Sequence, residues 1–185
     1  MKKSLTFTLF LALSAVLIGQ DRYFTKTGHI DFYSSTPVED IKAVNDQVTS
    51  FLDIKTGEMV FSVLMRSFQF EKALMQEHFN ENYVESAKFP KGSFSGIIVD
   101  FGKITWDKPG EYPVKLKGKL AIHGVTKEIE ADGTLTVETG KITGRSKFII
   151  RPEDYGIKIP QVVRNNIARE IQINVLMYYA PFKNQ

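Results

Sequence analysis

The sequence predicts an all-β domain, an eight-stranded antiparallel up-and-down barrel with one helical excursion. About eight segments alternate apolar and other residues with a period of two, which is typical of strands with one buried face. Tight turns join most of these segments, and several segments are long enough to favour a tall barrel over a sandwich. A barrel of eight strands can hold one small apolar ligand in its interior.

The clearest element is a hairpin over residues 118–131. Leu120 and Ile122 share one face of the first arm, the chain turns at a His-Gly pair, and Ile129 and Ala131 share a face on the way back. Two strands cannot keep an apolar face covered in water, so this hairpin requires further strands around it.

The remaining segments supply those strands. In chain order the predicted strands are Thr27–Ser34, Val44–Ile54, Met59–Met65, Phe94–Phe101, Tyr112–Ile122, Lys127–Glu138, Ile142–Ile150 and Arg169–Tyr179, with a shorter piece at Ile104–Trp106. Two segments have helical spacing instead, Glu71–Ala87 and, more weakly, Gln161–Ala168. The first of these is expected to cover the core, and a lid over the barrel is the alternative.

The amino terminus has the plan of a secretory signal peptide. A basic head precedes an apolar run from Leu5 to Ile18, which is short for a membrane span. We therefore predict a signal peptide over residues 1–20 and one domain over residues 21–185, with an uncleaved membrane anchor as the alternative. The signal peptide predicts a periplasmic or secreted location, with no stable membrane insertion after cleavage. Because the chain has no cysteine, its stability there must come from packing without disulfides.

The charge balance argues against a nucleic-acid partner. Without Lys2 and Lys3, 22 basic residues face 21 acidic ones, a formal charge of +1, and the two signs are interleaved. The three histidines, His29, His78 and His123, lack the paired spacing of a metal site. No catalytic residue, metal ligand or cofactor is therefore predicted.

Three stretches resemble one known family. Residues 120–129 are similar to the signature hairpin of the YceI-like family, the lipocalin-like polyisoprenoid-binding proteins of bacterial periplasms. Residues 88–94 are similar to its tyrosine-proline-x-x-x-phenylalanine entry to a strand, and residues 148–157 to its late phenylalanine-arginine-aspartate-aromatic-glycine motif. The resemblance extends from about Gly28 to Val175, although residues 34–37 depart from the family's usual continuation of the first strand.

The resemblance implies a barrel that encloses a long apolar cavity for an isoprenoid chain, such as a quinone or a polyprenyl lipid. The predicted ligand-binding residues are Phe32, Phe61, Val63, Met65, Phe94, Gly96, Ile98, Leu135, Phe148, Ile150, Arg151, Tyr155, Ile173 and Met177. Methionine suits such a wall because its side chain adapts its shape. Arg151 is expected to pair with Asp154 or, alternatively, to meet a polar head group at the mouth.

Three classes of function follow from these patterns. The first is an exported protein that binds an isoprenoid or similar lipid for transport, storage or sequestration. The second is a ligand-free structural or stress-interaction protein of the envelope, in which the same aromatic side chains fill the core. The third is an enzyme, which requires titratable residues inside the barrel and is not predicted. A homodimer through exposed aromatics such as Tyr178 and Tyr179 is left open.

Overall fold

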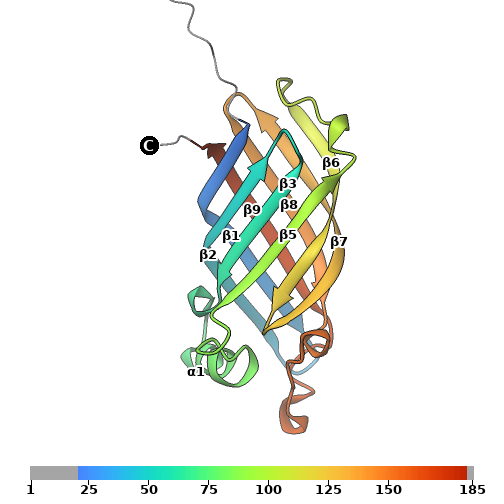
Figure 1. Cartoon of the computed structure of the whole chain (residues 1–185). Helices are drawn as coiled ribbons and strands as arrows, with labels where there is room; N and C mark the ends of the chain where they lie inside the picture. The colour runs from blue at the N-terminus through green and yellow to red at the C-terminus, as the bar shows by residue number, and fades with distance from the viewer. Residues whose placement is uncertain (1–20, 183–185) are drawn as a thin grey trace, which may run out of the picture.

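The computed structural model describes residues 21–182, which form a closed antiparallel barrel (Figure 1). Its strands lie in the order β1-β9-β8-β7-β6-β5-β3-β2, and pairing of β1 with β2 closes the ring. A two-residue strand, β4, pairs with Ala43 and Val44 of β2, beyond the part of β2 that pairs with β3. The predicted eight-stranded up-and-down barrel is therefore confirmed, while the predicted signal peptide lies outside the described residues.

The strands agree closely with the predicted segments. Their bounds are β1 (Arg22–Ser35), β2 (Asp40–Asp53), β3 (Glu58–Leu64), β4 (Gln69–Phe70), β5 (Lys91–Val99), β6 (Gly110–Ile122), β7 (Val125–Glu138), β8 (Lys141–Ile150) and β9 (Ile171–Pro181). The piece predicted as a strand at 104–106 is wrong, because a 3₁₀ turn, η3 (Phe101–Lys103), and irregular chain occupy this connection.

The helical segments are shorter than the sequence pattern predicts. Over residues 71–87 there is one six-residue helix, α1 (Ala73–His78), followed by a π-helical turn, η2 (Phe79–Tyr83). Over residues 161–168 only a 3₁₀ turn, η5 (Gln161–Val163), forms. The other 3₁₀ turns are η1 (Met65–Ser67) and η4 (Pro152–Tyr155). None of the helices in residues 21–182 is long and apolar enough to cross a membrane.

The antiparallel order places the connections alternately at the two ends of the barrel. The end that we call the closed end carries short connections at 54–57 and 139–140 together with the η3 connection at 100–109. The end that we call the mouth carries the longer connections at 65–90 and 151–170, the β1–β2 turn and the β6–β7 turn. Figure 1 shows α1 and the β8–β9 connection together at the mouth, with the described chain ends near the closed end.

The β6–β7 hairpin has the regular register that its sequence predicts. Thirteen residue pairs run from Gly110 opposite Val137 to Ile122 opposite Val125. His123 and Gly124 have φ values of 52° and 74°. Positive φ at both central residues is typical of the type I′ turn, whose twist matches that of the flanking strands.

Strand β2 contains a bulge that shifts its inward face. Gly28 pairs with Val48 whereas Ile30 pairs with Asn45, so β2 has one residue more than β1 over this stretch. Asn45 is completely buried, and its amide donates to the carbonyl of Leu64 at 2.9 Å. The bulge and the polar inward residue explain why the apolar face of β2 is poorly defined in the sequence.

Large side chains fill the closed end. Leu52, Ile98, Ile142 and Tyr179 are at most 2% exposed. The Tyr179 hydroxyl donates to Ser50 Oγ at 2.8 Å, and Ser50 in turn donates to the carbonyl of Val60 at 2.9 Å. Burial raises the pKa of Tyr179 well above its ordinary value. Tyr179 therefore points inward and is not the exposed contact for a second copy that was considered from the sequence.

Two facing glycines allow an aromatic ring to lie across the sheet. Gly96 of β5 pairs with Gly118 of β6, and the ring of Phe94 covers both. A Cβ atom on Gly118 would lie 2.5 Å from both Gly96 Cα and the carbonyl oxygen of Ser95. Because those atoms belong to paired backbone, they cannot move without disturbing the sheet.

We expect Gly118→Ala to lower the free energy of unfolding by about 1–3 kcal/mol, the usual cost of overpacking. Urea denaturation measures this change. Gly144→Ala on β8 is the matched control, because its new Cβ meets nothing closer than 3.4 Å. Equal stability of the two variants would contradict this account of the Gly96–Gly118 pair.

Candidate ligand-binding cavity

The barrel is hollow between its packed closed end and its mouth. A cavity of about 330 Å³ extends from Tyr179 and Met59, beside the closed end, to the connections of the mouth. Its walls are almost entirely apolar and come from strands all around the barrel. This volume lies at the lower end of the range for pockets that hold small molecules, about 300–1,000 Å³.

Inward side chains around the barrel differ in how much of their surface the protein covers. Inward side chains of β2 and β3, such as Ala43 and Met59, are buried by neighbouring side chains. Inward side chains of β6 and β9, such as Leu116, Ile173 and Val175, line the cavity and are only half-buried. Since these residues point into the barrel, their exposed surface faces the cavity, and an apolar ligand would cover it.

Aromatic side chains form the wall beneath the helical segment. Phe32 of β1 lies with ring centroids 5.4, 5.7 and 5.5 Å from those of Phe68, Phe70 and Phe79. Such tilted and edge-on arrangements are favourable for aromatic pairs. Phe79 belongs to η2, so the helical segment covers this side of the mouth, as predicted for a core-covering element. Its movement as a lid stays a prediction.

A polar cluster joins three connections at the mouth. Glu39 of the β1–β2 turn accepts from Lys72 Nζ at 3.0 Å and from Asn166 Nδ2 at 3.2 Å. We call Glu39, Lys72 and Asn166 the mouth clamp. Hydrogen bonds from Lys72 and Asn166 lower the pKa of Glu39 below its ordinary value. Close by, the amide of Ala168 donates to Ser34 Oγ at 2.9 Å.

His123 makes a second tie at the mouth. Its Nδ1 lies 3.1 Å from the carbonyl oxygen of Tyr155, and its Nε2 lies 2.6 Å from Glu85 Oε2. A carbonyl oxygen only accepts, so Nδ1 donates to Tyr155, and Nε2 forms the hydrogen bond with the Glu85 carboxylate. This hydrogen bond lowers the pKa of Glu85. The β6–β7 turn is thereby joined to the connections that follow η2 and β8.

Ten of the predicted ligand-binding residues line the cavity. They are Phe32, Phe61, Val63, Met65, Phe94, Leu135, Phe148, Ile150, Ile173 and Met177. Period-2 alternation places all ten on inward faces, and the barrel then brings them together. Their contact with a ligand stays a prediction.

Four predicted residues lie elsewhere. Gly96 is covered by the ring of Phe94, and Ile98 is buried in the closed end. Arg151 is exposed and pairs with Glu170 at 2.6 Å, so the expected pair with Asp154 is wrong. Tyr155 is 2% exposed but lies outside the cavity, where its carbonyl accepts from His123.

Sequence reasoning missed the residues that the connections contribute. Several of these line the cavity near the mouth, namely Met75, His78, Tyr83, Ile157, Val163 and Ile167. Because they lie in short turns without sustained periodicity, their inward direction depends on the tertiary fold. The apolar spacing within residues 71–87 was the one available signal, and it indicated a covering element rather than a cavity wall.

The cavity has the chemistry of a container for an apolar chain. Its carboxylate, imidazole and carboxamide groups belong to Glu39, His78 and Asn166, which all lie at the mouth. Within residues 21–182 no group of three or more histidine, aspartate, glutamate or cysteine side chains is arranged to hold a metal ion. The arrangement suits a molecule with a long apolar part and a polar end near the opening.

An antiparallel barrel of eight strands with an apolar cavity open at one end defines a lipocalin-like barrel. The family comparison gives the finer assignment: the chain belongs to the YceI-like domain family, whose model matches residues 20–178. The comparison with curated proteins returned no match.

Solved structures support the same fold. A polyisoprenoid-binding domain from Saccharophagus degradans implicated in plant cell wall breakdown has a TM-score of 0.76 at 14% identity, covering 88% of this chain and 99% of that one. Burkholderia cenocepacia BcnA has a TM-score of 0.68 at 13% identity, covering 83% and 96%. The Campylobacter jejuni YCEI protein has a TM-score of 0.54 at 17% identity, covering both chains fully. At these identities the likeness establishes the fold.

The mouth clamp should weaken in acid. The pKa of Glu39 is lowered in the folded protein. The ionised carboxylate therefore contributes to the stability of the mouth above the ordinary carboxyl pKa of about 4.3, and this contribution is lost as the pH falls through the pKa of the folded state. We expect Glu39→Gln to reduce the hydrogen-exchange protection factors of the Asn166 and Ala168 amides several-fold at neutral pH, and acid to do the same in the unmodified protein. Glu170→Gln, which removes a different mouth carboxylate, should leave them unchanged; an equal loss there would refute the role of the clamp.

Proposed function

We propose that this protein is an exported binding protein that holds an isoprenoid or similar long apolar lipid in its barrel cavity. The observation that carries the proposal is the open, largely apolar cavity, in which polar groups away from the mouth, such as the Tyr179 hydroxyl and Ser146 Oγ, are already hydrogen-bonded within the protein. Membership of the YceI-like family supports the same ligand class, as does the description of the Saccharophagus degradans neighbour as polyisoprenoid-binding.

Burial of a flexible apolar chain supplies the binding energy in this proposal. Each methylene group moved from water into an apolar site contributes about 0.8 kcal/mol. Met65 and Met177 lie in the wall and can adjust to the branches of such a chain. Half-buried lining side chains such as Leu116, Ile173 and Val175 gain most, because the protein leaves part of their surface uncovered.

The same geometry favours binding over catalysis. A general acid or base must lie within hydrogen-bond reach of the reacting group. Glu39, the carboxylate that borders the cavity, already bonds Lys72 and Asn166 through its two oxygens. We therefore propose a carrier or storage protein and not an enzyme.

The hollow interior also favours a ligand over the ligand-free envelope protein considered from the sequence. A structural protein gains nothing from leaving apolar walls unpacked, because each missing contact forfeits dispersion energy. Export to the periplasm or the exterior remains part of the proposal through the pattern of residues 1–20.

A cavity-filling variant tests the proposal. Val175 on β9 lines the cavity, and its neighbour Leu176 does not. We expect protein expressed with its amino-terminal segment in a bacterial envelope to retain an isoprenoid lipid, detected by extraction and mass spectrometry. Val175→Trp should lose most of this lipid because the indole occupies its space.

Leu176→Trp adds the same ring on the outer wall and should retain the lipid. Thermal unfolding of both variants shows whether each is folded. Absence of any isoprenoid lipid from the unmodified protein, or equal retention by both folded variants, would contradict binding in this cavity.

A further inference from the structure

Exposed apolar side chains surround the mouth on three separate connections. Val38 in the β1–β2 turn is 63% exposed, Leu74 on α1 is 61% exposed, and Val162 in η5 is 90% exposed. A single exposed apolar residue requires no explanation, but three at the tips of neighbouring connections indicate a contact surface. We call Val38, Leu74 and Val162 the apolar rim.

The mouth clamp brings these three connections together. Glu39, next to Val38, bonds Lys72, which precedes Leu74 by two residues. Glu39 also bonds Asn166, which follows Val162 by four residues. The rim residues therefore lie on three connections that Glu39 joins at the mouth of the barrel.

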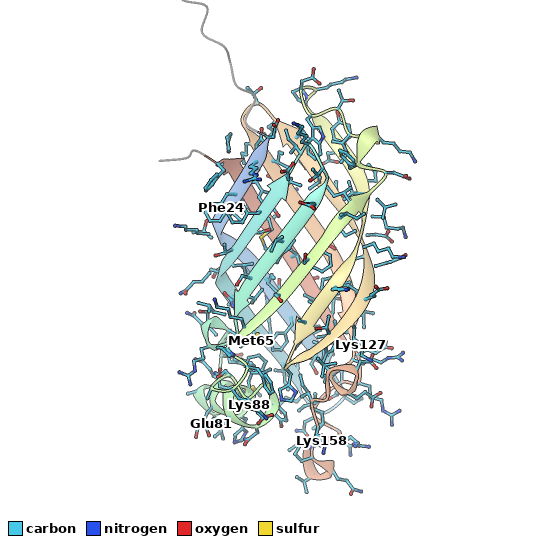
Figure 2. All side chains as sticks on the ribbon, in the orientation of Figure 1. Phe24, Met65, Glu81, Lys88, Lys127 and Lys158 are labelled. Carbon is cyan, nitrogen blue, oxygen red and sulfur yellow. The ribbon has the colours of Figure 1, made fainter. Side chains whose placement is uncertain are left out.

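The outer part of the β8–β9 connection is positively charged, whereas the whole connection over 151–170 has four basic and three acidic residues. Residues 156–169 contain Lys158, Arg164 and Arg169 and no acidic residue. All three side chains are exposed, and none forms an ion pair with another residue in the described part of the chain. Figure 2 shows Lys158 on this connection, at the extreme mouth end of the molecule. On the barrel wall, by contrast, Lys115 and Lys117 are paired with carboxylates of β7.

Apolar tips beside unpaired basic side chains fit the surface of an anionic lipid bilayer. The tips can enter the region between head groups and acyl chains, while the basic side chains meet the anionic head groups. The attraction comes from residues 156–169, because Glu71 and Glu77 lie on either side of Leu74 in the helical segment.

We propose that the mouth docks reversibly on an anionic lipid surface through the apolar rim and the basic outer part of the β8–β9 connection. In this orientation the cavity opens directly onto the bilayer, so a lipid can pass between the two without crossing water. The functional role of docking rests on the proposed lipid-binding function. Docking itself requires no lipid in the cavity, so vesicle binding and cavity binding can fail separately.

Vesicle flotation tests the proposal with the purified domain over residues 21–185. We expect binding to vesicles of equal parts phosphatidylglycerol and phosphatidylcholine, with weaker binding to phosphatidylcholine alone and a decrease as salt is added. Val162→Glu should reduce the partition coefficient roughly tenfold. Lys158→Gln combined with Arg164→Gln should reduce it by about tenfold or more at low salt.

Ile97→Glu is the matched control. Ile97 is 50% exposed on the outer wall of β5 near the closed end, far along the barrel from the rim. This variant should bind vesicles as the unmodified protein does. Lack of binding by the unmodified protein, or equal loss from Ile97→Glu and Val162→Glu, would overturn the proposal.

Fluorescence quenching gives a second readout of orientation. The one native tryptophan, Trp106, lies in the 100–109 connection at the closed end. Brominated phospholipids in the same anionic vesicles should quench Val162→Trp measured in a Trp106→Phe background, and should leave native Trp106 unquenched. The reverse pattern would place the wrong end on the membrane. Concentration-dependent dimerisation abolished by Val162→Glu, without vesicle binding, would assign the rim to a second copy and overturn the proposal.

Discussion

Pairing between β1 and β2 is the constraint on which the rest of this structure depends. It joins the first two strands of an eight-stranded ladder whose other pairs follow around the ring, so no long strand is left with a free edge. The backbone hydrogen bonds of a closed wall do not require a filled interior. One end can therefore be packed with large side chains while the rest of the barrel stays hollow.

The few polar groups inside are placed so that an apolar chain meets no unsatisfied partner. The hydroxyl of Tyr179, at the inner end of the cavity, is bound by Ser50. Among the described residues, the one buried side-chain nitrogen or oxygen without a partner is Asn80 Oδ1, which lies outside the cavity. Glu39 and Asn166 satisfy each other at the mouth. The polar groups that lie deep in the cavity are thus already paired within the protein.

Period-2 alternation predicts the strands and ten inward residues of the cavity, because burial on one face is a local property of the sequence. The other features of the site depend on residues that are far apart in the sequence. Gly96 was predicted to line the cavity because it lies on the inward register of its strand. Its cover by the Phe94 ring depends on the facing Gly118 of the next strand, which the local pattern does not show. Arg151 was paired with a near neighbour, although Glu170 reaches it only after the β8–β9 connection returns. The bulge in β2 likewise has no local signal in the sequence.

The two ends of the barrel differ in how they use irregular chain. The closed end needs only residues 54–57 and 139–140 at two of its turns, whereas the mouth has connections over 65–90 and 151–170. Lengthening a loop costs little entropy, so the length of these two connections alone does not indicate a function. Yet these connections supply the clamp and the apolar rim, and they also complete the cavity wall. The regular strands define the cavity, and the segments that periodicity describes least well form its mouth.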